Sequence, residues 1–374
     1  MDLDFSSEQE ILRDSAARFL ANECPYDHVK DIEETDQGYD PDLWRQVAEL
    51  GWTGLPFPEK YGGYEAQFLD LVIIEEEIGK AVFPSPFFST VVQCGLAILE
   101  GGTEEQKEDL LTQISEGSLI MALAQYEEDA SFNPASLSMK AEPQGDGYAL
   151  TGAKMFVVDA NIANKLLVAA HAGDKGLSLF VVDVQEPGLT ITRMPTVGMD
   201  NTCEVIFKDV KASLLGEAGT GIDVLNKMTT KAMVAKAAEM VGGAKVCIDM
   251  TAAYAREREQ YGKPVGGYQA VQHYMANMLI AYDNCSSYLY RVACMIDEGA
   301  DFETDAFALK ACANEAFDFI AERSVQIHGG IGTTREANVG LFYRRAKTYE
   351  SILGSPEYQY EKIADKLLNQ GFSN

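Results

Sequence analysis

The sequence has no apolar run long enough to cross a membrane, which takes about 18–20 consecutive residues. Its 374 residues are 47% hydrophobic and 24% charged, as in an ordinary globular protein. The chain opens with Met-Asp-Leu-Asp-Phe, without the basic and apolar regions of a signal peptide. We therefore expect a protein of the cytoplasm that does not act in a membrane.

Metal-binding motifs are also missing. The seven cysteines form no CxxC pair and the chain has only four histidines, so no zinc set or other metal site is predicted. The scattered thiols indicate reduced, buried side chains in a reducing compartment. The cysteines stand at positions 24, 94, 203, 247, 285, 294 and 312.

Positive charge is scarce as well. The formal net charge of −28 argues against nucleic acid or an anionic membrane as the main partner. No GxGxxG follows a strand-like run, so a Rossmann domain is not expected. An anionic cofactor would need locally placed basic groups.

The sequence predicts helices first, then strands, and then helices again. Residues 1–118 show helical periodicity, with a capping-box pattern at Ser6 and Gln9. Residues 119–220 hold about six short β-like runs, between 148 and 207, separated by turn residues. Residues 221–374 return to long helical segments. We predict an N-terminal helical domain, a central β barrel or sandwich, and a C-terminal helical bundle, an α+β arrangement.

Four stretches occur in an order that spans nearly the whole chain: 44–63, 147–154, 258–269, and 326–332 followed by 343–347. As an ordered set they resemble the acyl-CoA dehydrogenase family. The resemblance implies a four-helix C-terminal bundle, a tetramer assembled around FAD, and α,β-desaturation of an acyl-CoA. It also implies an electron-transfer flavoprotein as the electron acceptor.

Two of these motifs suit the phosphates of FAD. A guanidinium such as Arg258 can hold two pyrophosphate oxygens at once. The turn after His328 is rich in glycine, which has no Cβ, so its backbone N–H groups can approach a phosphate. In the family these elements reach the FAD of a neighbouring subunit. The residues that match that set are Arg258, Tyr261, Gln269, Gln326, Gly329 and Gly330.

The catalytic base of the family is absent. Desaturation needs a carboxylate that removes the α-proton while a β-hydride goes to flavin N5. Leu353 stands where the family's glutamate is expected, although Gly354 and Ser355 keep the pattern. Ala232 stands where some members carry that glutamate instead.

The residues that would serve FAD within the same subunit also differ. The family's flavin-binding loop has become Tyr126 to Asn133, where the phosphate-binding serine is replaced by Phe132 and two acids are added, Glu128 and Asp129. Added negative charge should repel an anionic cofactor. Phe156 can still stack on a flavin, but Val158 offers no hydroxyl.

Three interpretations remain open. The chain is the base-lacking subunit of a hetero-oligomeric acyl-CoA dehydrogenase, paired with a homologous catalytic subunit and acting on a bulky, cyclic or dicarboxylic acyl-CoA. Alternatively it is self-sufficient, as a self-associating tetramer with a relocated base, for which the weak candidates are Glu350, Glu357 and Glu127. Lastly, it is a non-redox member that binds acyl-CoA or serves assembly.

Overall fold

The computed structural model describes residues 5–145 and 147–370. The chain divides into two compact units, each assembled from separate parts of the sequence. One consists of Met1–Val29, Gln67–Phe83 and Met233–Asn374, and we call it the bundle unit. The other consists of Lys30–Ala66 and Pro84–Ala232, and we call it the barrel unit. The predicted boundaries at 118 and 220 are not tested by this division and stay a prediction.

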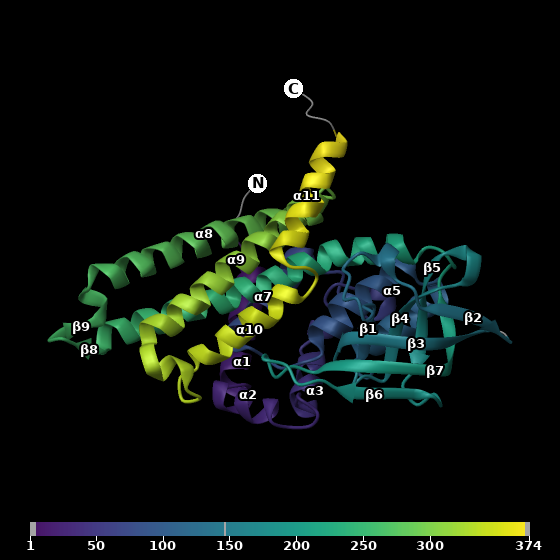
Figure 1. Ribbon diagram of the computed structural model, residues 1–374, viewed down its shortest axis with the longest axis horizontal. Coiled ribbons are helices and arrows are strands. Elements are labelled where there is room, and N and C mark those ends of the chain that lie inside the picture. The colour runs from purple at the N-terminus through teal and green to yellow at the C-terminus, as the bar shows by residue number, and fades with distance from the viewer. Residues whose placement is uncertain (1–4, 146, 371–374) are drawn as a thin grey trace. The chain divides into compact units, whose positions relative to one another are not determined.

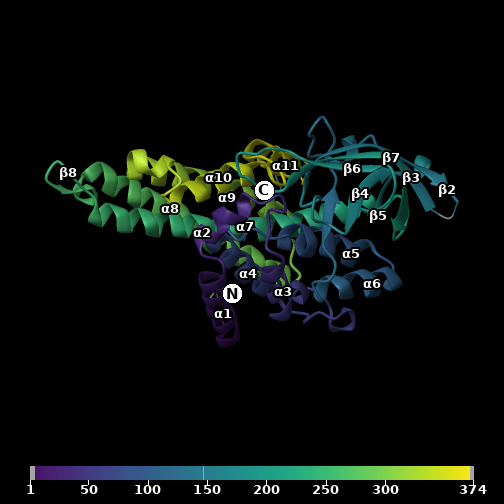
Figure 2. The same ribbon diagram turned by 90° about the horizontal axis from the view of Figure 1, so that it is seen from below.

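The bundle unit is helical. In Figures 1 and 2 the helices α8, α9 and α10 run side by side along the bundle part of α7. The last helix, α11, also packs on α9. The helical periodicity predicted for residues 221–374 corresponds to α7 to α11. The helices are α1 (Ser7–Glu23), α4 (Phe68–Ala81), α7 (Gly221–Glu257, shared with the barrel unit), α8 (Gln269–Asp297), α9 (Glu303–His328), α10 (Val339–Ser351) and α11 (Pro356–Gln370).

Local sequence signals explain where several helices begin. The Ser6 side chain accepts the Gln9 N–H, and the Gln9 side chain accepts the Ser6 N–H, which confirms the predicted capping box. Thr103 and Gln106 form the same reciprocal pair at the start of α6 (Glu104–Ser115). Asp40 caps α3 (Pro41–Glu49), and α2 (Tyr26–Glu33) and α5 (Leu96–Gly101) complete the α-helices of the described residues.

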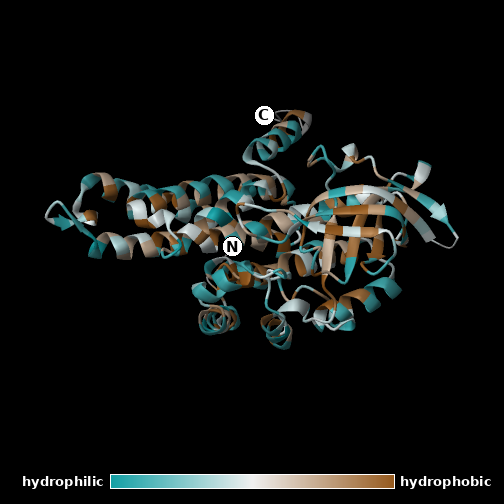
Figure 3. Ribbon diagram, turned by 60° about the horizontal axis from the view of Figure 1, so that its bottom comes forward, coloured by the Kyte–Doolittle hydropathy of each residue, from teal (hydrophilic) through white to brown (hydrophobic). Residues whose placement is uncertain are grey.

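The barrel unit contains a seven-stranded sheet. Strands β4, β2, β3, β7 and β5 pair in that order, and β5 pairs again with β4, so the sheet closes into a barrel. In Figure 3 these strands carry long brown, apolar stretches, as expected for a filled interior. The strands are β1 (Met121–Ala124), β2 (Lys140–Gln144), β3 (Gly147–Val158), β4 (Lys165–His171), β5 (Leu177–Asp183), β6 (Leu189–Arg193) and β7 (Thr202–Leu215).

The predicted fold class is confirmed, with differences inside the β segment. Sequence patterns did not identify β1 and β2. All four residues of β1 are buried, so the strand shows no alternation, and β2 contains Pro143, which is a poor strand former. The first two of the predicted β-like runs, over 148–151 and 154–158, belong to one bulged strand, β3. Within the described residues no helix is long and apolar enough to span a membrane.

Helices α4 and α7 approach each other until their backbones touch. A Cβ on Gly79 would lie 2.0 Å from the carbonyl oxygen of Glu239, and one on Gly242 would lie 2.0 Å from that of Glu76. No real Cβ tolerates such a contact, so both positions require glycine. This contact fixes which side chains of the two helices face one another.

We expect Gly79→Ala to destabilise the protein by about 1–3 kcal/mol, because the added methyl group forces the α4 and α7 backbones apart. Urea unfolding followed by circular dichroism measures this change. Gly340→Ala in α10 is the matched control, since its Cβ would meet only ordinary contacts at 3.6 Å or more. An equal loss in both variants would contradict the close-contact explanation.

Candidate functional site

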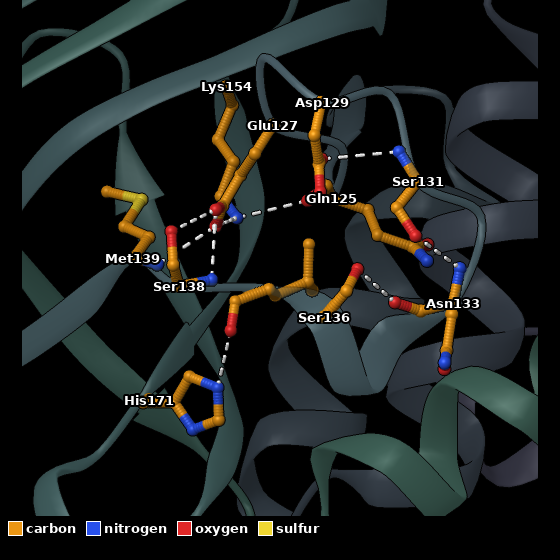
Figure 4. Close-up of polar contacts among 11 residues, drawn as sticks. Gln125, Glu127, Asp129, Ser131, Asn133, Ser136, Ser138, Met139, Lys154 and His171 are labelled. Carbon is orange, nitrogen blue, oxygen red and sulfur yellow. Dashed lines mark hydrogen bonds and ion pairs between the residues drawn. The ribbon is translucent and has the colours of Figure 1, made fainter.

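A buried ion pair organises the part of the barrel unit that resembles a flavin-binding loop. The Lys154 ammonium is fully buried and donates to Glu127 Oε1 at 2.8 Å and to the Gln125 carbonyl at 3.0 Å. The Glu127 carboxylate also accepts the backbone N–H groups of Ser138 and Met139 and the Ser138 hydroxyl. Figure 4 shows these groups converging on the one carboxylate.

This arrangement argues against Glu127 as a base. Burial alone would raise its pKa, but the hydrogen bonds from Lys154, Ser138 and Met139 outweigh burial and hold the pKa at about 2. A carboxylate with such a pKa is a weak proton acceptor, and its oxygens are already engaged. Glu127 is therefore a structural anchor for the loop. The sequence contained Lys154 in a recognised motif but gave no signal of its partner.

The loop between Glu127 and Ser138 uses its own side chains to satisfy its backbone. Asp129 Oδ1 accepts the Ser131 N–H at 3.2 Å, Ser131 Oγ accepts the Asn133 N–H at 3.2 Å, and Asn133 Oδ1 accepts the Ala135 N–H at 3.1 Å (Figure 4). A phosphate would need such N–H groups free. The Asp129 carboxylate thus accepts an N–H group that a cofactor phosphate would otherwise bind. The loop therefore does not fit a pyrophosphate.

Phe156 is the aromatic residue of this region that is presented outward. It lies in the β3 bulge between Lys154 and Val157, where the register against β7 shifts. Its φ is +56°, an uncommon value for a bulky residue, and its side chain is 42% exposed. Bulges re-aim side chains in this way beside functional sites. The predicted stacking of Phe156 on a flavin stays a prediction.

Both expected base positions are buried and lack an acid. Leu353 is 3% exposed and Ala232 is 0% exposed. Leu353 has a φ of +62°, so the turn after α10 holds a bulky residue in the left-handed region. Its carbonyl accepts from Gln359 Nε2 at 2.8 Å. The turn after α10 is thus closed by a buried leucine and a backbone hydrogen bond, and position 353 presents no carboxylate.

The other two candidate bases lie near that turn in the sequence but differ in setting. Glu350 is half-buried in the last turn of α10, and Glu357 is exposed in the first turn of α11. A hydrogen bond from Ser355 lowers the pKa of Glu357, which makes it a poorer base. No observed contact assigns proton abstraction to either residue.

The residues matched to a neighbour's FAD gather at one end of the bundle unit. Arg258 follows the end of α7, Gln269 begins α8, and α9 ends just before Gly329. The Tyr254 hydroxyl donates to the His328 carbonyl at 3.1 Å and the two rings stack, which ties the end of α7 to the end of α9. The hairpin of β8 (Glu259–Gln260) and β9 (Lys263–Pro264) joins α7 to α8 at this end (Figure 1).

This end of the bundle is open and polar. Arg258, Gln269 and Gln326 are exposed, and Tyr261 is 96% exposed. A Cβ on Gly329 or Gly330 would meet nothing within 4 Å, so the backbone there is free for the approach of a ligand. In contrast to the loop at Asp129, these residues fit the phosphates of FAD: a guanidinium for charge and bare backbone for contact.

Three family models together match most of the chain: the N-terminal domain of acyl-CoA dehydrogenase over residues 6–118, its middle domain over 122–210, and its C-terminal domain over 219–368. A probable acyl-CoA dehydrogenase YngJ of Bacillus subtilis is 30% identical, covering 98% of this chain and 100% of that protein. The chain belongs to the acyl-CoA dehydrogenase family, whose members are FAD-dependent oxidoreductases.

Two similar solved structures each carry a pair of protein names, and one of them is named as a complex. A Tcur3481-Tcur3483 steroid ACAD variant is 31% identical with a TM-score of 0.89, covering 97% of this chain and 98% of that one. The ChsE4-ChsE5 complex from Mycobacterium tuberculosis is 26% identical with a TM-score of 0.90, covering 98% and 99%. The match in fold extends over the whole of each chain.

We expect Glu127→Gln to lower stability at neutral pH by an amount that shrinks in acid. The folded-state pKa of Glu127 is about 2, below its usual 4.5, so its stabilisation is complete above about 4.5 and is lost as the pH falls towards 2. Urea unfolding of both proteins from pH 7 to pH 3 measures the difference. The exposed neighbour Glu128→Gln is the control, and a gap that stays constant across this range would contradict the assignment.

Proposed function

We propose that this chain is the base-lacking subunit of a hetero-oligomeric acyl-CoA dehydrogenase. It lends Arg258 and the Gln326–Gly330 segment to the FAD of a homologous catalytic subunit. The observation that carries this proposal is a contrast between the two regions. In the loop that would serve FAD within the chain, the side chains of Asp129, Ser131 and Asn133 take up backbone N–H groups. At Gly329 and Gly330, by contrast, a Cβ would meet nothing within 4 Å, and the guanidinium side chain of Arg258 is exposed.

The paired names of the two similar structures, one of them named as a complex, support a two-component assembly. The steroid named in one of them agrees with the expectation of a bulky, cyclic or dicarboxylic acyl-CoA. In such an assembly, FAD would supply hydride acceptance at the catalytic subunit. This chain would neutralise and orient the cofactor's phosphates from across the interface. An electron-transfer flavoprotein as acceptor and a cytoplasmic location stay predictions.

The first test is the FAD content of the chain purified alone and of the complex with its partner. We expect little FAD and no acyl-CoA oxidation for the single chain, and one FAD for each pair of chains in the complex. Full FAD occupancy with turnover by the single chain would instead favour a self-sufficient enzyme. A native complex without flavin would favour the non-redox interpretation.

A second test removes the guanidinium. We expect Arg258→Ala to weaken FAD retention by the complex about ten- to a hundredfold, because a hydrogen bond to a charged group contributes about 1.5–3 kcal/mol. Equilibrium dialysis of FAD against the complex measures this. Arg256→Ala, an exposed arginine two residues earlier, is the matched control. If both variants retained FAD like the unmodified complex, the proposed role of Arg258 would be wrong.

A further inference from the structure

Helices α8 and α9 follow each other in the sequence and run antiparallel in the bundle unit. The short connection 298–302 joins them, and Figures 1 and 2 show them side by side. Near the start of α8, the centre of the Tyr274 ring lies 5.1 Å from the guanidinium carbon of Arg323, near the end of α9. Near the other end of the pair, Arg291 Nη2 lies 3.8 Å from Asp305 Oδ1. These two contacts fix which residues of α8 lie opposite which residues of α9.

This register places two cysteines opposite each other. Cys285 follows Tyr274 by eleven residues, and Cys312 precedes Arg323 by eleven residues. Eleven residues make about three complete turns of an α-helix, so each cysteine lies on the face of its helix that carries the contact. The Cys285 thiol donates a hydrogen bond to the Cys312 sulfur, and neither residue is in a disulfide. The contact between Tyr274 and Arg323 therefore accounts for two sulfur atoms that meet in the middle of the helix pair.

The helix surfaces around the two cysteines carry small side chains. Ala308 and Ala316 lie one turn before and one turn after Cys312, and Ala281 lies one turn before Cys285. Small side chains let two helix axes approach to about 8 Å, and helix Cα atoms lie about 2.3 Å from their own axis. Facing Cα atoms at that spacing come within the span of about 4.4–6.8 Å that a disulfide bridges. The helix pair can thus close an S–S bond without being rebuilt.

The two thiols differ in exposure and in acidity. Cys285 is 1% exposed, whereas Cys312 is half-buried and reachable from solvent. The hydrogen bond from Cys285 lowers the pKa of Cys312 and outweighs burial and the Glu315 carboxylate, which raise it. The same hydrogen bond, and next burial, raise the pKa of Cys285 well above its usual value. An accessible thiol of lowered pKa beside a second, resolving thiol is typical of redox-sensitive proteins.

We propose that Cys285 and Cys312 form a dithiol that hydrogen peroxide oxidises to a disulfide between α8 and α9. Cys312 is the thiol that reacts with the peroxide, and Cys285 is the thiol that resolves the product. The inference does not depend on the proposed function, because Gln269 and Gln326, the FAD-contact candidates on these two helices, lie at the far end of the pair.

The oxidation balances in two steps. The Cys312 thiolate attacks one oxygen of hydrogen peroxide and the O–O bond breaks, so that the other oxygen leaves as hydroxide and takes up the proton that the thiol lost. The product is a sulfenic acid on Cys312. The Cys285 sulfur then attacks the Cys312 sulfur, the S–O bond breaks, and the hydroxyl leaves with the Cys285 proton as water. Two thiols and one peroxide thus give one disulfide and two waters, and dithiothreitol reverses the change by thiol–disulfide exchange.

Peptide mapping of the oxidised chain tests the proposal. The purified chain is treated with hydrogen peroxide, alkylated with iodoacetamide in urea and digested with trypsin. Cleavage after lysine and arginine, except before proline, separates three thiols, with Cys285 in 259–291, Cys294 in 292–310 and Cys312 in 311–323. We expect mass spectrometry to find 259–291 linked to 311–323, two hydrogens lighter than the separate peptides, and dithiothreitol to release both. Cys294 is the internal control on α8, because burial and nearby carboxylates raise its pKa, and it should be recovered as an alkylated thiol.

Three results would overturn the proposal. One is oxidation of Cys312 to a sulfinic acid while Cys285 is recovered as a free thiol, because the two sulfurs would then be too far apart to join. Another is the absence of the linked peptide at a peroxide dose that oxidises Cys294, because Cys312 would then have no special reactivity. The third is a linkage between two chains, which a non-reducing gel would reveal as a dimer.

A variant that lacks the second thiol tests the order of the two steps. In Cys285→Ala the sulfenic acid on Cys312 has no thiol to resolve it, so we expect dimedone to label Cys312 at least about tenfold more than in the unmodified chain. Cys294→Ala is the matched control, and it should still form the disulfide without added label. Circular dichroism checks that both variants fold, and the peptide map of the unmodified chain decides the proposal if they do not. Equal labelling of Cys312 in the unmodified chain and in folded Cys285→Ala would contradict the assignment of Cys285 as the resolving thiol.

Discussion

The contact between the backbones of α4 and α7 is the constraint on which the interior of the bundle unit depends. With Gly79 and Gly242 both pressed against the facing helix, neither helix can rotate or slide without a steric clash. The residues one turn from these glycines, Glu75 and Glu239, are therefore held in mutual contact. Two carboxyl groups forced together in an apolar interior must share a proton or recruit a cation, and Lys236 supplies the cation.

Much of the fold follows from local sequence signals. Helix starts at Ser6, Asp40 and Thr103 carry side chains that cap the backbone, and the return of helical periodicity after residue 220 places α7 correctly. The strand β1 was not predicted, because a fully buried run of four residues shows no alternation of apolar and polar side chains. Hydrophobic periodicity reports which side of an element faces solvent, and neither side of β1 does.

The sequence indicated which residues belong to the candidate site, but it indicated only some of the contacts between them. Motif spacing singled out Arg258 and Gly330 as candidates, since both lie in short, local motifs. The ion pair between Glu127 and Lys154 joins residues 27 positions apart, and only the closed barrel brings them together. Lys236 and Glu239 are buried charges within a run of alanine, methionine and valine, and their burial depends on the facing helices, which the local sequence does not reveal.

Binding the cofactor of another subunit and binding an acyl group require different placements of charge. A surface that grips another subunit's cofactor needs exposed donors and bare backbone, and it places no requirement on the bundle interior. An acyl site requires the opposite, an apolar interior beside a base. If the catalytic subunit supplies the base, as proposed, this chain has no need of an apolar interior beside a base of its own. Buried charges are then tolerated where they neutralise one another, as Lys236 and Glu239 do at 2.7 Å.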